Sequence, residues 1–487
     1  MRYLAFFGFF VFLFFISRIY RLQFIPIFVD EAIYVNWALL GFQDASLRLI
    51  SLIDGKQPLY IWIVSIVLNI IHNPLIAGRI VSTLAGFITA VGLFLLSLEL
   101  FKNKKIALIS AFLYTLYPFA LVLNRMALYE SLVGAFAVWG LYLVILLVRY
   151  TQSGFAFLLG FVLGGGLLTK SSGFISLLLF PSAFFLFPHK GKESLRKLFL
   201  LISYYFIACL VGFLFYSVLL LSDKFYMIAE KNSVFVYHVS ELLPYNALGK
   251  WVPQLLQLIS WAALYLTYPL FIIIFLSLLN VKFRKEKLIL LLNFLVPLIG
   301  FALFDRILNS RYIFAITLFL LPLGALGIHE FCIKYRKIIP VIFLLIFSFL
   351  IYSDFKIISD MPHAPIPKED LQQYVNGTTS GVGLREIIGY LMSIASKESI
   401  VIATEGIYGS LPTTVVKTYF LNYPQVEIEP FEKMSKNLPL SLLEKSKNKP
   451  VYVILNETQS VSNWPLKLIM KYKRGVSNYF MGLYQVL

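Results

Sequence analysis

The feature that most constrains this chain is a series of apolar stretches, each close to the roughly 20 residues that cross the hydrocarbon core of a bilayer. Hydrophobic residues make up 59% of the 487 residues and charged residues only 14%, which is more apolar than a soluble core requires. The sequence therefore predicts an α-helical, polytopic integral membrane protein of about eleven spans. The spans are expected near residues 3–20, 79–101, 106–124, 131–149, 155–169, 171–188, 198–221, 256–280, 288–304, 311–330 and 338–353.

Basic residues cluster between these stretches, and every cluster falls on the same predicted side of the membrane. Because Lys and Arg concentrate in cytoplasmic loops, this pattern predicts a multi-pass protein of the plasma membrane with a cytoplasmic N-terminus. It also accounts for the net charge of +17 without a nucleic-acid partner. The clusters are Lys102, Lys104 and Lys105; Arg149; Lys190, Lys192, Arg196 and Lys197; Lys282, Arg284, Lys285 and Lys287; and Lys334, Arg336 and Lys337.

The chain changes character after residue 354, where a proline-containing linker leads into a region of mixed charge. Short β-branched runs there alternate with helix-like stretches, as in a small α/β sheet. We therefore expect a membrane domain over 1–353, with outer loops 21–78 and 222–255, and an extracytoplasmic α/β domain over 354–487. The expected strands are Ile400–Thr404, Val426–Ile428, Val451–Leu455 and Tyr484–Leu487, and the expected helices are Leu384–Ala395 and Leu438–Lys445.

Two adjacent carboxylates, Asp30 and Glu31, follow the first apolar stretch on the predicted outer side. Taken alone, such a pair is more often the solvated first turn of a helix than a functional site. The same outer loop, however, carries Lys56 before Gln57 and Pro58. A lysine there suits a phosphate at the depth of the lipid headgroups. Charged side chains at the edge of a membrane cost free energy, so their presence there indicates a function.

Further polar residues are expected on the outer side. Glu130 and Arg125 follow the third apolar stretch, and Arg79, Lys170 and Arg311 are additional outer cations. Any one of these cations could simply extend a long side chain to the interface. Several cations at one depth, facing carboxylates, are what a lipid phosphate and a proton-abstracting base would require.

In their order along the chain, several segments resemble those of GT-C glycosyltransferases. They are Asp30-Glu31-Ala32-Ile33-Tyr34, Lys56-Gln57-Pro58-Leu59, Arg79, the segment from Arg125 to Glu130, Leu168-Thr169-Lys170 and Arg311-Tyr312. The chain looks like the family that includes protein O-mannosyltransferases and the aminoarabinose transferase of lipid A, over roughly the first 330 residues. It departs from the family in reading Lys-Gln-Pro instead of Lys-Pro-Pro, and in carrying Glu130 where an aspartate is often found.

The resemblance implies an inverting hexosyl or pentosyl transferase. It would move a sugar from a polyprenyl phosphate to a protein, lipid or glycan acceptor at the extracytoplasmic membrane face. We expect the domain over 354–487 to help to position that acceptor, so its removal should leave binding of the sugar donor intact. The resemblance implies catalytic roles for Asp30, Glu31 and Glu130, with Asp30 as the base. The donor phosphate would be bound by Lys56, Arg79, Arg125, Lys170 and Arg311. Side chains expected at the cleft are Tyr34, Tyr60, Tyr237, His238 and Tyr312; the segment 229–243 either covers the cleft or is a simple connector.

No cofactor is expected to be required, because no cluster of histidines and carboxylates has metal-binding spacing, although Asp30, Glu31 and Glu130 could together hold a divalent ion. Two other functions stay open. One is a polyprenyl-lipid transporter or flippase, and the other is a homologue that binds the lipid without turnover. Transporters tend to place their charges near the membrane midplane in broken helices. Here the charges collect at one interface, which favours an enzyme.

Overall fold

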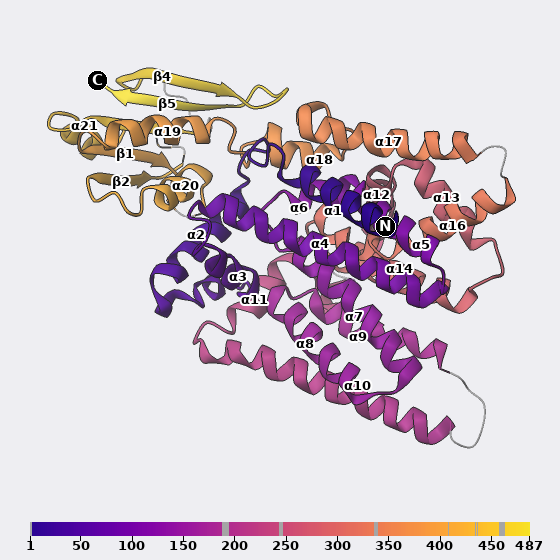
Figure 1. Cartoon of the computed structure of the whole chain (residues 1–487). Helices are drawn as coiled ribbons and strands as arrows, with labels where there is room; N and C mark the ends of the chain where they lie inside the picture. The colour runs from indigo at the N-terminus through magenta and orange to yellow at the C-terminus, as the bar shows by residue number, and fades with distance from the viewer. Residues whose placement is uncertain are drawn as a thin grey trace.

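The computed structural model describes residues 2–187, 194–242, 247–335, 339–407, 409–433, 435, 437–456 and 463–487. Most of the chain is helical, and a small sheet lies near the C-terminus (Figure 1). The basic residues Lys190, Lys192, Arg336 and Lys337 lie outside the described residues. The helices of the first 359 residues are α1 (Arg2–Ile19), α2 (Val29–Gln43), α3 (Leu59–Val67), α4 (Pro74–Phe101), α5 (Lys104–Thr115), α6 (Pro118–Asn124), α7 (Glu130–Tyr150), α8 (Ser153–Thr169), α9 (Gly173–Leu179), α10 (Ser194–Tyr216), α11 (Met227–Phe235), α12 (Ala247–Leu266), α13 (Tyr268–Leu278), α14 (Arg284–Phe304), α15 (Phe314–Thr317), α16 (Leu320–Lys334) and α17 (Ile339–Ser359).

Four helical segments of the described chain are long and apolar enough to cross a membrane: α4, α7, α10 with the turn that follows it, and α14. The number rises to seven if each of three bent helix pairs is one span. These pairs fall on the predicted spans 106–124, 256–280 and 311–330. The helices support an integral membrane protein, and the figure of eleven spans stays a prediction.

The bends have local causes. α12 and α13 meet at 107°, and α5 and α6 meet at 57°. Pro269 and Pro118 stand in the first turn of the second helix of each pair. Proline has no N–H to donate to the carbonyl four residues earlier, so the preceding helix cannot continue through it. An apolar stretch long enough to cross a bilayer therefore forms two helices joined by a bend at these two places.

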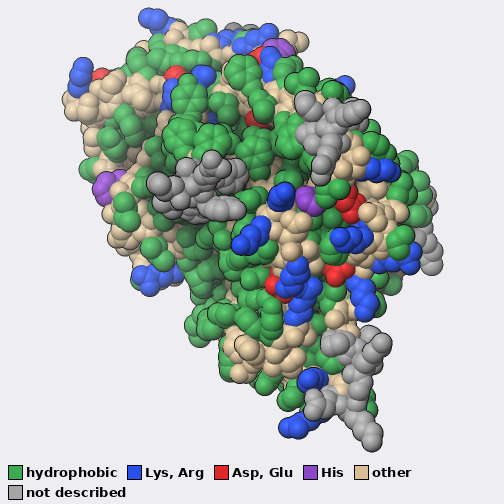
Figure 2. Space-filling model, turned by 45° about the vertical axis from the view of Figure 1, so that its right-hand side comes forward, with side chains coloured by type: hydrophobic (Ala, Val, Ile, Leu, Met, Phe, Trp, Pro, Cys, Tyr) green, Lys and Arg blue, Asp and Glu red, His purple; other side chains and the backbone are tan. Residues whose placement is uncertain are grey.

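The basic loops gather at one end of the helices. The ring of Phe101, at the end of α4, packs 5.2 Å from that of Phe283 before α14. Asn280, after α13, donates a hydrogen bond to Glu330 of α16 at 2.9 Å. Figure 2 shows Lys and Arg side chains grouped on the face turned forward, among hydrophobic side chains. The described basic clusters of these three loops thus lie on one side, as the sequence predicts.

The C-terminal sheet has the strand order β2-β1-β3-β5-β4, with β1 parallel to β2 and β3 and the other pairs antiparallel. Four strands agree with the sequence prediction in place, and β4 was not predicted. α17 runs to Ser359, past the predicted boundary at residue 354. The elements are α18 (Lys368–Leu371), α19 (Leu384–Ala395), β1 (Ile400–Glu405), α20 (Leu411–Tyr419), β2 (Val426–Phe431), α21 (Leu440–Ser446), β3 (Val451–Leu455), β4 (Leu466–Lys473) and β5 (Phe480–Val486).

This C-terminal region packs on the helix that carries the first predicted site residue. α20 lies against α2, as Figure 1 shows. The amide of Asn36 in α2 donates to the hydroxyl of Thr418 at 3.0 Å, and Gln43 donates to Asn422 at 3.0 Å. Apolar side chains of α2 and α19 also share one buried cluster, which contains Ala32. The C-terminal region is therefore attached directly to the segment around Asp30.

Candidate active site

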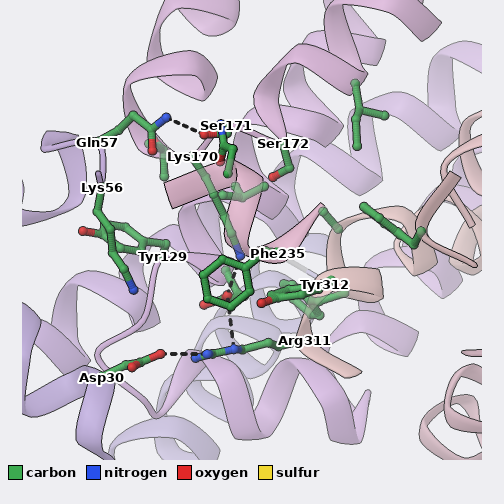
Figure 3. A pocket seen from close by; sticks show the side chains of 18 of the residues that line it. Asp30, Lys56, Gln57, Tyr129, Lys170, Ser171, Ser172, Phe235, Arg311 and Tyr312 are labelled. Atoms are coloured by element: carbon green, nitrogen blue, oxygen red, sulfur yellow. Dashed lines mark hydrogen bonds and ion pairs between the residues drawn. The ribbon is translucent and has the colours of Figure 1, made fainter. Parts of the chain in front are cut away.

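A cavity of about 830 Å³ opens between the ends of several helices, and its size is in the range of ligand-binding pockets. One part of its wall is charged and is formed by Asp30, Lys56, Glu130, Lys170 and Arg311 (Figure 3). Another part is apolar and comes largely from α7, α14 and α15. Its residues are Val133, Ala137, Pro297, Phe301, Phe314, Ala315, Ile316 and Phe319. The cavity thus joins a polar end to an apolar wall built on candidate membrane helices.

Helix ends place the charged side chains. Asp30 lies in the first turn of α2, and Glu130 is the first residue of α7. Lys170 directly follows α8, and Arg311 lies in the 3₁₀ turn Ser310–Ile313 before α15. At a helix end the backbone leaves its regular hydrogen bonding, and charged side chains are tolerated there. Residues far apart in sequence therefore meet where these helices begin and end.

Lys56 is held by a tight turn. Gly55 before it has φ +64°, and a Cβ there would lie 2.4 Å from the carbonyl oxygen of Met227 in α11, so only glycine fits. The Lys56 ammonium donates to the hydroxyl of Tyr34 at 2.9 Å and lies 3.8 Å from Asp54. Asp54 in turn pairs with Lys231 of α11 at 2.5 Å. The turn thus fixes Lys56 against α11 at the cavity wall.

An ion network crosses the cavity. One Nη of Arg311 lies 2.7 Å from a carboxylate oxygen of Asp30, and its Nε lies 3.9 Å from Glu130. Lys170 donates to the same Glu130 oxygen at 2.9 Å, and its Nζ lies 4.8 Å from the centre of the Tyr312 ring. In Figure 3 the amines of Lys56 and Lys170 point toward the Asp30–Arg311 ion pair. Three cations and two carboxylates therefore face one space.

The protonation states of Asp30 and Tyr34 follow from this network. Burial would raise the pKa of Asp30, but Arg311 and Lys56 outweigh it, so this pKa lies below its ordinary value. Burial raises the pKa of Tyr34 well above its ordinary value, and the charge of Asp30 adds to the shift. Asp30 is therefore ionised and Tyr34 neutral near pH 7.

Several polar atoms of the cavity wall lack a hydrogen-bond partner among the described residues. They include the hydroxyl of Tyr129, one carboxylate oxygen of Glu130 and one of Asp305. A buried polar atom without a partner costs about 1–3 kcal/mol, and more if it is charged. Buried polar groups that are not fully compensated within the protein are typical of a functional site. Their presence among the residues that line the cavity therefore supports a functional role for it.

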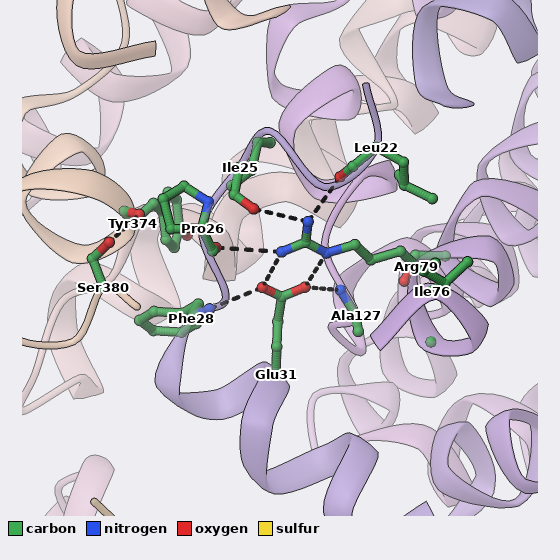
Figure 4. A network of polar contacts seen from close by, with 12 residues as sticks. Leu22, Ile25, Pro26, Phe28, Glu31, Ile76, Arg79, Ala127, Tyr374 and Ser380 are labelled. Atoms are coloured by element: carbon green, nitrogen blue, oxygen red, sulfur yellow. Dashed lines mark hydrogen bonds and ion pairs between the residues drawn. The ribbon is translucent and has the colours of Figure 1, made fainter. Parts of the chain in front are cut away.

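Glu31 and Arg79 do not reach this site, and their assignment to catalysis and phosphate binding has to be corrected (Figure 4). Both side chains are fully buried, and Arg79 donates two hydrogen bonds to Glu31, at 2.9 and 2.8 Å. Arg79 also donates to the carbonyls of Leu22 and Ile25, and Glu31 accepts the N–H of Ala127 at 2.6 Å. The pair joins α2, α4 and two loops, so its role is structural.

Arg125 likewise has a structural environment. Its guanidinium is fully buried and donates to the carbonyls of Ser17 and Arg18, at 2.8 and 3.1 Å, and to those of Tyr20 and Arg21. These carbonyls lie at the C-terminal end of α1, where they have no partners within the helix. Arg125 is therefore a cap for α1 and is not among the residues that line the cavity.

Of the residues predicted to lie at the cleft, some line the cavity and others do not. Tyr34 and Tyr312 line the cavity, whereas Tyr60 is buried and donates to the carbonyl of Gly78 at 2.8 Å. Tyr237 and His238 are not lining residues: the Tyr237 ring lies 4.7 Å from the guanidinium carbon of Arg306, and His238 is exposed. The segment 229–243 does contact the cavity, through Lys231, Asn232, Phe235 and Val236.

The start of the C-terminal region forms hydrogen bonds with the residues next to Asp30 and next to Arg311. Asp370 accepts a hydrogen bond from Ser310, the neighbour of the arginine, at 2.6 Å. The carbonyl of Thr379 accepts the N–H of Val29, the neighbour of the aspartate, at 3.1 Å. Removal of this region would break both contacts. The structure thus revises the expectation that such a deletion leaves donor binding intact.

The structure also reveals site residues that the sequence analysis missed. Asp305, Tyr129 and Asp54 line the cavity. Asp305 directly follows an apolar stretch, so the rule that identified Asp30 and Glu130 could have found it. Among the described residues, no group of three or more His, Cys, Asp or Glu side chains is placed to hold a metal ion. The trio of Asp30, Glu31 and Glu130 does not form, since Glu31 is bound by Arg79.

Comparisons with known proteins agree with this architecture. A family model described as dolichyl-phosphate-mannose-protein mannosyltransferase matches residues 55–220. No curated protein sequence matches the chain. Two crystal structures of ArnT from Cupriavidus metallidurans are similar in fold. The apo structure shares 12% identity at a TM-score of 0.55, covering 100% of this chain and 98% of ArnT. The structure bound to undecaprenyl phosphate shares 13% identity at a TM-score of 0.56, covering 99% of this chain and 97% of ArnT. The chain therefore has a fold similar to that of ArnT and resembles the dolichyl-phosphate-mannose-protein mannosyltransferases over residues 55–220.

Proposed function

We propose that this protein is an inverting glycosyltransferase that moves a sugar from a polyprenyl phosphate to an acceptor outside the cytoplasm. One observation carries the proposal: a single cavity joins three cations and a carboxylate base to an apolar wall on membrane helices. A polyprenyl phosphate has the matching parts, a long apolar tail and an anionic headgroup. The fold shared with ArnT, which has been crystallised with undecaprenyl phosphate, supports this donor class.

The reaction follows from the ion network. In the structure Arg311 pairs with Asp30, which lowers the pKa of the aspartate and makes it a weak base. A donor phosphate would compete for Arg311, and Asp30 would regain basicity as the pair loosens. Asp30 then takes the proton of the acceptor hydroxyl or amine while the acceptor atom bonds to the anomeric carbon. The bond from that carbon to the phosphate oxygen breaks, and polyprenyl phosphate leaves with the electron pair.

This single displacement inverts the configuration at the anomeric carbon, because the acceptor attacks opposite the leaving phosphate. Lys56, Lys170 and Arg311 would stabilise the negative charge that develops on the phosphate. Glu130 contacts both Lys170 and Arg311 and so holds two of these cations in place. Its second carboxylate oxygen is buried and has no hydrogen-bond partner among the described residues.

The dimensions of two helices support a site at the outer interface. α7 runs from Glu130 at the cavity to Arg149 near the basic end, and α14 runs from Arg284 at the basic end to Phe304 beside the cavity. Each has 21 residues, which at about 1.5 Å per residue spans the roughly 30 Å of a bilayer core. With the basic end cytoplasmic, the cavity lies at the opposite, extracytoplasmic face.

Replacing Lys56 with methionine should weaken binding of the polyprenyl phosphate donor. The loss of one charge-assisted contact costs about 2 kcal/mol, or roughly 30-fold in the Michaelis constant for the donor. Transfer kinetics with purified protein in nanodiscs would measure it. Lys104→Met is the matched control, because Lys104 is exposed at the start of α5, beyond the C-terminal end of α4, and its replacement should leave the constant unchanged. An unchanged donor constant in the Lys56 variant would exclude this role.

We expect sugar transfer to persist at full rate after removal of divalent ions with EDTA. The reason is that Lys56, Lys170 and Arg311 already provide positive charge for the leaving phosphate. Initial rates before and after chelation would measure the effect. A rate that falls by more than about tenfold and returns with added Mg²⁺ or Mn²⁺ would show that a metal is required after all.

One variant distinguishes sugar transfer from lipid transport as the function of this protein. In proteoliposomes, Asp30→Asn should abolish sugar transfer and leave any movement of polyprenyl phosphate across the bilayer unchanged. The wild-type protein should transfer sugar from a labelled donor to acceptors in a membrane extract. If the wild-type protein moved the lipid but transferred no sugar, the protein would be a transporter or flippase.

A further inference from the structure

Asp305 is a buried carboxyl group whose backbone is fixed and whose side chain is not fully partnered. It is 6% exposed, lines the cavity, and has one oxygen without a hydrogen-bond partner among the described residues. Its backbone pairs with that of Val236 in an antiparallel bridge. The flanking N–H of Tyr237 donates to Phe304, and that of Arg306 donates to Phe235, both at 2.8 Å. The fixed backbone holds the Asp305 carboxyl group at the wall of the cavity, which preorganises it for a ligand.

The cost of this arrangement supports a ligand-binding role. Burial raises the pKa of Asp305 to about 7, although the charge of Lys170 opposes the shift. Near neutral pH the group is thus substantially ionised while one of its oxygens lacks a donor. A hydrogen-bond donor from a ligand would compensate for this. Donors of that kind are hydroxyl and amine groups.

The neighbours of Asp305 indicate which part of a substrate would lie there. The positive charge of Lys170 counteracts the effect of burial on the pKa of Asp305, which places the two groups near each other. The Nζ of Lys170 also lies 4.8 Å from the centre of the Tyr312 ring. If Lys170 binds the phosphate of the donor, the sugar ring attached to that phosphate must begin next to Lys170. The Tyr312 ring offers a flat apolar surface beside it, and the Asp305 carboxylate offers an acceptor for a ring substituent.

We propose that Asp305 accepts a hydrogen bond from a hydroxyl of the sugar carried by the donor, and that it selects neutral sugars over sugars bearing a carboxylate. This inference rests on the proposed function and names the substrate class of the same site. A uronic acid would bring a like charge next to the carboxylate of Asp305, and like charges in a buried site repel strongly. The cations of the same wall, Lys56, Lys170 and Arg311, would already be engaged by the donor phosphate.

Binding measurements test this independently of turnover. Wild-type protein and the variants Asp305→Ala and Asp305→Asn would be titrated with undecaprenyl phosphate, with its hexose form and with its hexuronic acid form. We expect the alanine variant to bind undecaprenyl phosphate as the wild type does and to lose about 10- to 100-fold in affinity for the hexose form. The asparagine variant keeps an acceptor oxygen and should lose less than tenfold. Both variants should discriminate less against the hexuronic acid form.

The outcomes separate this inference from the proposed function. Hexose-form affinity within twofold of wild type in the alanine variant would overturn the role of Asp305, as would an equal loss for undecaprenyl phosphate with and without sugar. A change confined to the Michaelis constant for the acceptor would likewise overturn it. Wild-type protein that binds every lipid but transfers no sugar would instead overturn the proposed function. Thermal unfolding of both variants in detergent checks that they are folded.

Discussion

Replacing Asp30 with asparagine is expected to lower the rate of sugar transfer by at least about 1,000-fold, because the amide cannot accept the proton of the attacking acceptor. Asparagine keeps the size of the side chain, and Lys56, Lys170 and Arg311 stay available for the phosphate. Donor affinity should therefore be preserved or increase, since Arg311 loses its competing partner. Single-turnover transfer and equilibrium binding of undecaprenyl phosphate measure the two quantities separately.

Asp44→Asn is the matched control. Asp44 caps the other end of the same helix, is exposed and bonds only locally to Ser46 among the described residues. This variant should transfer sugar at the wild-type rate. An Asp30 variant that turned over near the wild-type rate would remove Asp30 from the role of base and would direct attention to Glu130.

Replacing Arg79 with methionine is expected to destabilise the fold rather than to change donor binding. The substitution leaves the Glu31 carboxylate buried without its charged partner, and breaking a buried ion pair in this way costs about 3–5 kcal/mol. It also releases the carbonyls of Leu22 and Ile25 from their hydrogen bonds. Thermal unfolding in detergent and the yield of monodisperse protein measure the loss.

Arg385→Met makes the same chemical change at an exposed pair. Arg385 lies 3.3 Å from Glu386, and both side chains are largely open to solvent. Such pairs contribute about 0–1 kcal/mol, so the unfolding temperature should barely move. If the Arg79 variant were as stable as this control but bound donor poorly, Arg79 would belong to the donor site and the structural assignment would fail.

The contrast between Asp30 and Glu31 shows what the sequence could not decide. Adjacent residues of an α-helix point about 100° apart, since a turn takes 3.6 residues. In the first turn of α2, one carboxylate therefore faces the cavity and the other faces α4. Two acidic residues in a row indicate a site at the membrane edge, but the direction of each depends on how α2 packs.

The cations pose a similar problem. The sequence grouped Arg79 and Arg125 with Lys56, Lys170 and Arg311, because all five lie at the same predicted depth. Arg79 and Arg125 instead satisfy backbone carbonyls where the chain leaves α1 and enters the outer loop. Free carbonyls at a helix end are also good acceptors for a guanidinium, so an arginine at this depth need not bind a phosphate. Only tertiary packing shows which partner an arginine has.

The fold was predictable to different degrees in its two parts. In the C-terminal region, β-branched runs marked four strands near their positions, and the two clearest, β1 and β3, are buried along their whole length. β4 was missed, since lysines alternate with apolar residues along Leu466–Lys473, as in an edge strand with one solvated face. In the membrane part, hydropathy marked where apolar helices occur but not where proline bends them.

The measurement that most directly tests the account is a donor assay with purified protein in nanodiscs. The protein would be offered a panel of radiolabelled polyprenyl phosphate sugars, with a membrane extract as the source of acceptor. The account predicts that at least one neutral sugar is consumed, that one polyprenyl phosphate is released for each sugar transferred, that the product has inverted anomeric configuration, and that the Asp30→Asn protein shows none of this. Binding of the lipids without consumption of any donor, or transfer with retained configuration, would contradict it.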